Sequence, residues 1–253
     1  MGAVEICIIG FALIFGGAVL GMFLREILPD HHLRDESKDT IKVGVATVST
    51  LSAMVLGLLV SSAKNSYDTM NSEMIQSAAN VVLLDRVLAN YGDETKTVRK
   101  QLHASIVLAV DQMWPEQGIR GPSAAVFERI NYLEGVQLAM LNLKPATDAQ
   151  RVLLSQAEQL MFGLRQTRWL LVEQSHNALP SAFLVVLIFW LTVMHFSFGL
   201  FAPRNLTVFA ALFLCSVSVS CALFIIIELS HPMHGVVRIS GAPMRNSLAQ
   251  LNK

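Results

Sequence analysis

Four long apolar runs, arranged as two pairs around a more polar middle, constrain this chain more than any other feature. Each run is about 20 residues or slightly longer, the length that an α-helix needs to cross roughly 30 Å of hydrocarbon. The runs cover residues 3–24, 43–63, 179–201 and 206–229, and their charged residues, Glu5 and Glu228, lie close to the ends of their runs. In lipid every backbone polar group must be satisfied within its own segment, so each run is expected to be a helix. The sequence therefore predicts an all-α integral membrane protein with four transmembrane helices.

The order of these runs predicts the organisation of the chain. Residues 1–63 form a first transmembrane hairpin, residues 64–178 an extramembrane helical bundle inserted between spans 2 and 3, residues 179–229 a second hairpin, and residues 230–253 a polar C-terminal tail. An even number of crossings places both termini and the bundle on one side of the membrane. The positive charges near the spans are balanced between the two sides, so they do not decide the orientation.

The middle region has the pattern of long bundle helices. A heptad-like seam follows the second run without an intervening glycine or proline, so span 2 is expected to continue as one helix to about Asn90. The seam consists of Tyr67, Met70, Met74, Ser77, Val81, Leu84 and Leu88. Thr147 and Gln150 have capping-box spacing and are expected to begin the last bundle helix, which leads towards span 3. In the tail, Pro232 and Pro243 are expected to break any continuous helix.

Composition and motifs exclude several classes of function. The 19 Lys and Arg balance the 19 Asp and Glu, so nothing indicates a nucleic-acid partner. The three cysteines all lie inside apolar runs, which supports neither a disulfide framework nor a thiolate metal site. The acidic and histidine-containing loop at residues 30–39 is interpreted as a solvated loop rather than a metal site. The sequence contains no phosphate-binding glycine loop, no His-Glu-x-x-His and no Gly-x-Ser-x-Gly, so we expect no enzyme activity and no cofactor.

The second run carries the main candidate site. One helical face presents small and hydroxyl residues and ends at a lysine: Ala46, Thr50, Ala53, Gly57, Ser61 and Lys64. Two interpretations are open. Small residues usually mark close helix packing, within or between subunits, whereas hydroxyl groups can also replace water around a permeating ion. A pore would require several copies of the chain, because four spans of one subunit leave little room for a channel.

Two other features of the spans are weaker signals. His195 is the one titratable side chain well inside the later runs, and a polar group at that depth is a functional candidate. It lies less than two turns from Phe201, so its ring could instead reach the membrane interface. Gly17 and Gly21 form a small-xxx-small pattern, which indicates packing against a neighbouring span of the same chain.

Short characteristic segments occur along nearly the whole chain, at residues 28–33, 35–39, 55–59, 62–64, 166–171, 189–193, 198–205 and 228–235. Together these segments closely resemble one family, the bacterial bestrophin-like membrane proteins of unknown function. The family is distantly similar to the bestrophin anion channels, which have four spans, cytosolic termini, a helical cytosolic part and an oligomeric pore lined by the second span. This chain lacks the acidic residues of the bestrophin calcium clasp and the phenylalanine-lined neck.

The resemblance implies a homo-oligomeric ion channel of the bacterial inner membrane, with the termini and helical domain in the cytoplasm. Its partners would be the lipid bilayer, further copies of itself and inorganic ions, with Lys64 favouring anions. A second interpretation, of a different class, is a non-conducting scaffold or signalling protein whose helical domain binds a protein partner. That interpretation predicts an exposed apolar patch on the middle helices. A membrane enzyme ranks third, because no residue stands out as a nucleophile.

Overall fold

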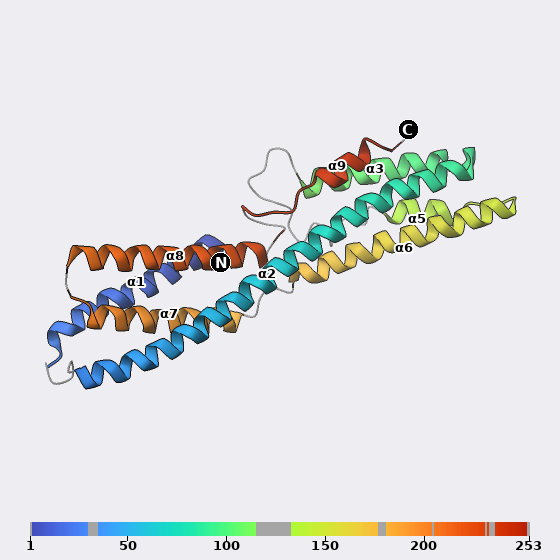
Figure 1. Cartoon of the computed structure of the whole chain (residues 1–253). Coiled ribbons are helices and arrows are strands. Elements are labelled where there is room, and N and C mark those ends of the chain that lie inside the picture. Colours follow the sequence, from blue (N-terminus) through green and yellow to red (C-terminus); the bar gives the residue numbers. More distant parts are fainter. Residues whose placement is uncertain are drawn as a thin grey trace. The chain divides into compact units, whose positions relative to one another are not determined.

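The computed structural model describes residues 2–29, 35–114, 133–176, 181–203, 205–230, 232 and 236–251. All regular structure in these ranges is helical, which confirms the predicted all-α class. The elements, labelled in Figure 1 where there is room, are α1 (Ala3–Ile27), α2 (Asp35–Tyr91), the short 3-10 helix η2 (Asp93–Thr95), α3 (Lys96–Met113), α5 (Glu134–Leu141), α6 (Asp148–His176), α7 (Ser181–Phe201), α8 (Leu206–Ser230) and α9 (Ala242–Leu248).

Four of the described helices, α1, α2, α7 and α8, are long and apolar enough to cross a membrane. They coincide with the four predicted runs. Helix α2 is 57 residues long and continues well past the apolar run. Its length follows from the sequence, because no glycine or proline interrupts the chain between Leu58 and Tyr91. The predicted connection between the bundle and span 3 crosses residues 177–180, which lie outside the described residues.

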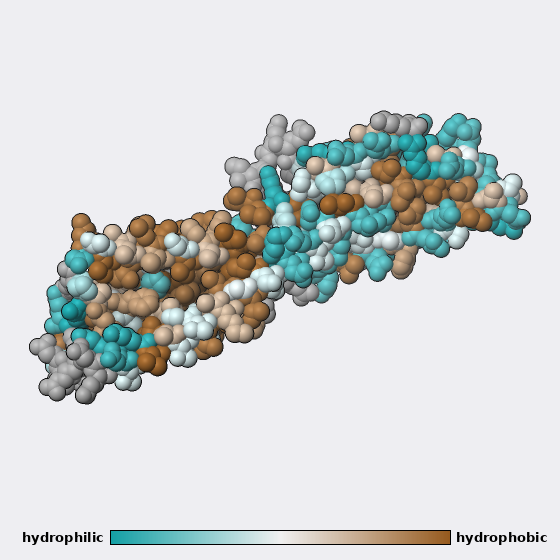
Figure 2. Space-filling view, viewed as in Figure 1, coloured by the Kyte–Doolittle hydropathy of each residue, from teal (hydrophilic) through white to brown (hydrophobic). Residues whose placement is uncertain are grey.

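The chain divides into two compact units. Unit 1 consists of Met1–Asn65 and Leu179–Ser230, and unit 2 of Ser66–Ala178 and His231–Lys253, so α2 contributes residues to both. On the face shown in Figure 2, the surface of unit 1 is mainly apolar, whereas that of unit 2 is mainly hydrophilic with a distinct apolar patch. An apolar surface over four membrane-length helices is what a lipid solvent requires.

Helix α1 packs against α7 and α8 in unit 1 (Figure 1). The approach to α7 depends on glycines on both helices. A Cβ atom on Gly17 would lie 3.0 Å from the carbonyl oxygen of Thr192, and one on Gly21 would overlap the backbone of Phe196. A Cβ atom on Gly199 would overlap the backbone of α1 in turn. The predicted packing of Gly17 and Gly21 within the chain is therefore confirmed.

Unit 2 is a helical body with its own apolar core. The predicted seam of α2 is buried there from Met70 to Leu88, together with Leu102 and Ile106 of α3 and Leu164 of α6. The capping box is partly as expected. Thr147 Oγ1 accepts a hydrogen bond of 3.2 Å from the backbone nitrogen of Gln150, but the Gln150 side chain accepts from Ala146 rather than from Thr147.

The C-terminal tail differs from the polar segment that the sequence predicts. Ile239, Met244 and Leu251 are buried in the core of unit 2. Trp114 Nε1 donates a 3.1 Å hydrogen bond to the carbonyl oxygen of Ile239. Pro243 lies in the first turn of α9, where its missing N–H costs nothing, so it helps to begin a helix rather than break one. The tail is thus an integral part of unit 2.

Candidate functional site

The candidate stripe on α2 lies on the surface of unit 1. All six of its members are exposed: Ala46, Thr50, Ala53, Gly57, Ser61 and Lys64. The opposite side of the same helix is buried at Ser52, Leu59 and Ala63. The stripe therefore stays accessible on the surface of unit 1, where another subunit, lipid or water can cover it.

The stripe has neighbours of different character on the helix surface. Leu51, Met54 and Leu58 are 45%, 65% and 61% exposed and follow each other at helical spacing. They form a row of large apolar side chains beside the row of small ones. The large apolar row suits contact with lipid or protein, whereas the small row leaves space beside the helix. At Gly57, for example, a Cβ atom would meet no atom within 4 Å.

Two hydroxyl groups near the start of this segment donate hydrogen bonds to the helix itself. Thr50 Oγ1 donates to the carbonyl oxygen of Ala46 at 3.0 Å, and Ser49 Oγ donates to that of Val45 at 2.8 Å. In this arrangement Thr50 presents oxygen lone pairs outwards. A cation can accept these lone pairs directly, whereas an anion requires the hydroxyl to turn its hydrogen away from the backbone.

Charged residues that the sequence analysis did not include extend the stripe at both ends. Asp39 and Lys42 lie before it on α2 and form an exposed pair, with Lys42 Nζ 3.1 Å from Asp39 Oδ1. Asp68 lies four residues after Lys64, on the same face of α2, and both are exposed. Continuing the three- and four-residue steps in both directions would have found these positions.

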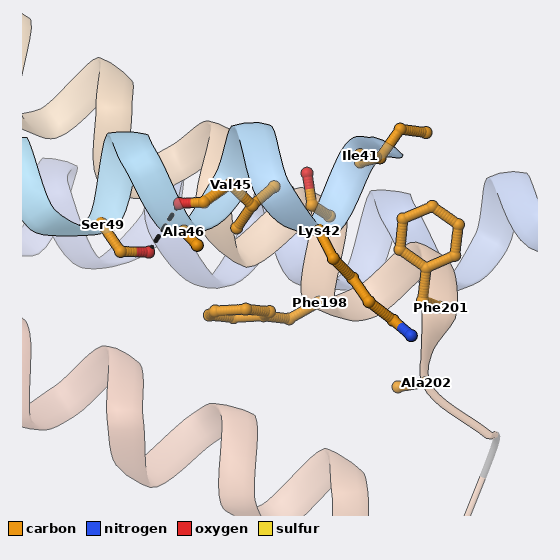
Figure 3. Close-up of a pocket in the computed structure, with 9 residues that line it drawn as sticks. Ile41, Lys42, Val45, Ala46, Ser49, Phe198, Phe201 and Ala202 are labelled. Atoms are coloured by element: carbon orange, nitrogen blue, oxygen red, sulfur yellow. Dashed lines mark hydrogen bonds between the residues drawn. The ribbon is translucent and has the colours of Figure 1, made fainter. Parts of the chain in front are cut away.

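A groove lies beside the start of the stripe, between the first turns of α2 and the last turns of α7 (Figure 3). It has a cavity volume of about 610 Å³ and shares Ala46 with the stripe. Its lining consists of Ile41, Lys42, Val45, Ala46, Ser49, Ser197, Phe198, Phe201 and Ala202. This groove could not be predicted from the sequence, because its two walls come from segments far apart in the chain.

His195 is buried inside unit 1, with an exposed fraction of 4%. The suggestion that its ring reaches the membrane interface is therefore wrong. Nδ1 lies 2.8 Å from the carbonyl oxygen of Leu191, which can only accept, so the neutral ring carries its hydrogen on Nδ1. Nε2 is buried and has no hydrogen-bond partner among the described residues. The imidazole and the Phe198 ring form an edge-to-face pair, with 6.0 Å between their centroids.

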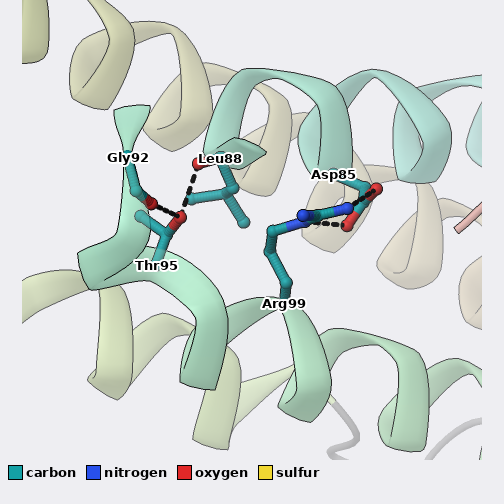
Figure 4. A network of polar contacts seen from close by, with 5 residues as sticks. All are labelled: Asp85, Leu88, Gly92, Thr95 and Arg99. Atoms are coloured by element: carbon teal, nitrogen blue, oxygen red, sulfur yellow. Dashed lines mark hydrogen bonds and ion pairs between the residues drawn. The ribbon is translucent and has the colours of Figure 1, made fainter. Parts of the chain in front are cut away.

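A close ion pair in unit 2 joins α2 to α3 (Figure 4). Arg99 donates to both carboxylate oxygens of Asp85, at 2.7 and 2.8 Å, and the Asp85 side chain is 2% exposed. The hydrogen bond to Asp85 raises the pKa of Arg99 above its ordinary value. Nearby, Thr95 Oγ1 donates to the carbonyl oxygens of Leu88 and Gly92. These contacts fix the turn between the helices and indicate a structural role.

Among the described residues no group of three or more His, Cys, Asp or Glu could hold a metal ion. The side chains of the loop at residues 30–37 and those of His231 and His234 lie outside the described residues. The expectation that this chain needs no metal or cofactor remains a prediction.

Comparison with known proteins gave one family. A sequence profile described as a Bestrophin-like domain matches residues 12–244, from within α1 to within α9, and so covers both units. Searches of curated proteins and of solved structures gave no match.

Proposed function

This chain belongs to the bestrophin-like family, and from that premise we propose that it forms a homo-oligomeric ion channel of the bacterial inner membrane. In this proposal the α2 helices of several copies surround a central path. The termini and unit 2 lie in the cytoplasm. The surface of unit 1 then serves both subunit contact and ion conduction. The large apolar row of α2 contacts protein or lipid, and the small-residue stripe faces the central path.

The observation that carries the proposal is the exposure of the whole small-residue stripe on a helix whose opposite side is buried. Apolar spans normally use small residues to bring helices of one chain together, as α1 and α7 do at Gly17 and Gly199. On α2 the same residue types remain on the outside, where Gly57 has open space. A stripe of that kind supports a narrow path bounded by backbone and hydroxyl groups once copies assemble.

Lys64 is the candidate for ion preference. It ends the stripe where the apolar run gives way to polar sequence, and in an oligomer one copy per subunit would form a ring of positive charge. Asp68 on the same face would partly offset that ring. A preference for anions therefore follows only if Lys64 lies closer to the path than Asp68.

Reconstitution tests the proposal. Purified full-length protein in planar bilayers should give discrete conductance, measured over a range of voltage, pH and salts. Lys64→Glu should lower the anion-to-cation permeability ratio severalfold, because each subunit changes by two charges. Lys100→Glu, the same change at an exposed position on α3, serves as the matched control and should leave the ratio unchanged. A well-folded wild-type protein without conductance would count against a channel.

A specific observation favours the second candidate, a scaffold that binds a protein partner. Leu138, Leu141 and Phe162 are 57%, 64% and 70% exposed beside a groove between α5 and α6 of unit 2. Apolar side chains gathered on an otherwise hydrophilic surface often mark a protein contact. This function would be favoured over a channel if a protein partner co-purified in stoichiometric amount with the wild type but not with Phe162→Asp, and if the wild type showed no ion flux.

A further inference from the structure

The groove between α2 and α7 is apolar on most of its surface and opens to the outside of unit 1. Val45 of α2 and Phe198 and Phe201 of α7 provide its walls, and the Phe198 ring lies flat along it (Figure 3). Phe198 is 44% exposed, so the ring is not covered by the chain. A volume of about 610 Å³ with such a lining falls in the range of ligand-binding pockets.

The position of the groove along the transmembrane helices indicates which part of the bilayer surrounds it. It lies at the first turns of the α2 apolar run and at the last turns of α7, which are the ends of two membrane-length helices. A groove at that level of a transmembrane helix borders both the hydrocarbon and the head-group region of a bilayer. Its occupant therefore needs an apolar part and a polar part.

Two cations lie at the polar end of the groove. The Lys42 side chain extends across it, with the ammonium group pointing towards Ala202 (Figure 3). Arg25, in the last turn of α1, donates to the carbonyl oxygen of the same Ala202. Lys42 also pairs with Asp39, but the two side chains are 65% and 73% exposed. Exposed pairs contribute little, so the ammonium group can exchange this carboxylate for a phosphate.

We propose that this groove binds an anionic phospholipid. One acyl chain lies along Val45, Phe198 and Phe201, and the head-group phosphate lies against Lys42 near Arg25. Basic residues beside a gap between transmembrane helices recognise acidic head groups in this way. Because the groove includes Ala46, the bound lipid would border the start of the small-residue stripe. The site depends on a membrane location and not on conduction.

Native mass spectrometry of the delipidated full-length protein in detergent tests this site. Phosphatidylglycerol and phosphatidylcholine with the same acyl chains are the two probes. Phosphatidylglycerol should bind several times more tightly. Lys42→Gln should weaken phosphatidylglycerol binding about fivefold, the effect expected for one cation near a lipid surface. It should weaken phosphatidylcholine binding less, because the choline group of that lipid offsets the charge of its phosphate. Ala46→Phe, which fills the groove, should weaken binding of both lipids.

Lys38→Gln is the matched control, because it removes the same charge one turn earlier on α2 and Lys38 does not line the groove. Equal losses in Lys38→Gln and Lys42→Gln would indicate general attraction to acidic lipid and would overturn the site. So would equal affinity for both lipids, or unchanged binding in Ala46→Phe. If the wild type carries no bound lipid and the Ala46→Phe oligomer has a lower mass, the groove is a contact between subunits and not a lipid site. If Ala46→Phe loses helical content, the two lysine variants decide.

Discussion

The Asp85–Arg99 pair gives the sharpest stability prediction for unit 2. Arg99 makes two charge-assisted hydrogen bonds of 2.7 and 2.8 Å to a carboxylate that is 2% exposed, while its own side chain is 19% exposed. Breaking a buried pair usually costs about 3–5 kcal/mol. Arg99→Met leaves the buried Asp85 charge without the guanidinium, so we expect a loss of about 4 kcal/mol in the free energy of unfolding.

The two partners should not be equivalent. Asp85→Asn keeps an acceptor for one hydrogen bond, and the partly exposed Arg99 can recover water, so its cost should be about 2 kcal/mol. The double variant Asp85→Leu/Arg99→Met removes both charges and should lie within about 1 kcal/mol of wild type, because apolar replacements of buried pairs are often nearly neutral. The order of stability is thus wild type, double variant, Asp85→Asn and Arg99→Met.

Thermal unfolding of the detergent-solubilised protein can measure this order. Trp114 is buried in unit 2 and reports on it, in a background where Trp169 and Trp190 are phenylalanine. For a unit of this size 1 kcal/mol corresponds to about 4 °C, so Arg99→Met should melt about 15 °C lower. The reasoning is refuted if Arg99→Met melts like wild type, or if the double variant is no more stable than Arg99→Met.

Three further predictions concern packing and pH. Gly199→Ala should destabilise unit 1 by about 1–3 kcal/mol, because its Cβ would overlap the α1 backbone, and should lower the melting temperature measured by circular dichroism. Gly57→Ala, where the Cβ meets open space, should leave the melting temperature unchanged. Equal effects of the two variants would contradict a close approach of α1 and α7 through glycine. Burial raises the pKa of Tyr91, and its hydroxyl has no hydrogen-bond partner among the described residues. The folded state therefore holds this proton more tightly, and stability should fall as pH rises above about 10. Tyr91→Phe should be at least as stable at pH 8 and lose that pH dependence in thermal melts; an unchanged slope would exclude Tyr91 as its source. Met244→Ala should destabilise unit 2 by about 2–4 kcal/mol in denaturant titrations, and a neutral result would mean that the tail is not part of the core.

Much of the fold follows from periodicity along the sequence. Apolar runs of membrane length predict α1, α7 and α8 within a few residues, and the seam from Met70 to Leu88 predicts which side of α2 is buried in unit 2. These features depend on the spacing of residues close together in the chain, which can be read from a single sequence. The small-xxx-small pattern at Gly17 and Gly21 also predicts that α1 packs against a neighbouring span, because small residues in a transmembrane helix allow two helix backbones to approach closely.

Features that depend on distant segments could not be predicted in the same way. The groove requires Val45 and Phe198 to face each other, and nothing in either run specifies that pairing. Burial of His195 depends on the helices around α7 rather than on its distance from Phe201. Burial of the tail could not be predicted, because Ile239 and Met244 occur in a polar, proline-containing segment without helical periodicity. Both belong to the same buried cluster as Trp114, whose Nε1 donates to the carbonyl oxygen of Ile239.

Whether the small-residue stripe of α2 meets water can be measured directly. In a background in which Cys7, Cys215 and Cys221 are alanine, single cysteines at Gly57 and at Leu58 occupy the small row and the large row of the same helix. A charged, water-soluble thiol reagent applied to reconstituted protein should alter the conductance of Gly57→Cys and leave Leu58→Cys unaffected. Modification of Leu58→Cys alone, or of neither cysteine in a conducting protein, would contradict a path along this stripe.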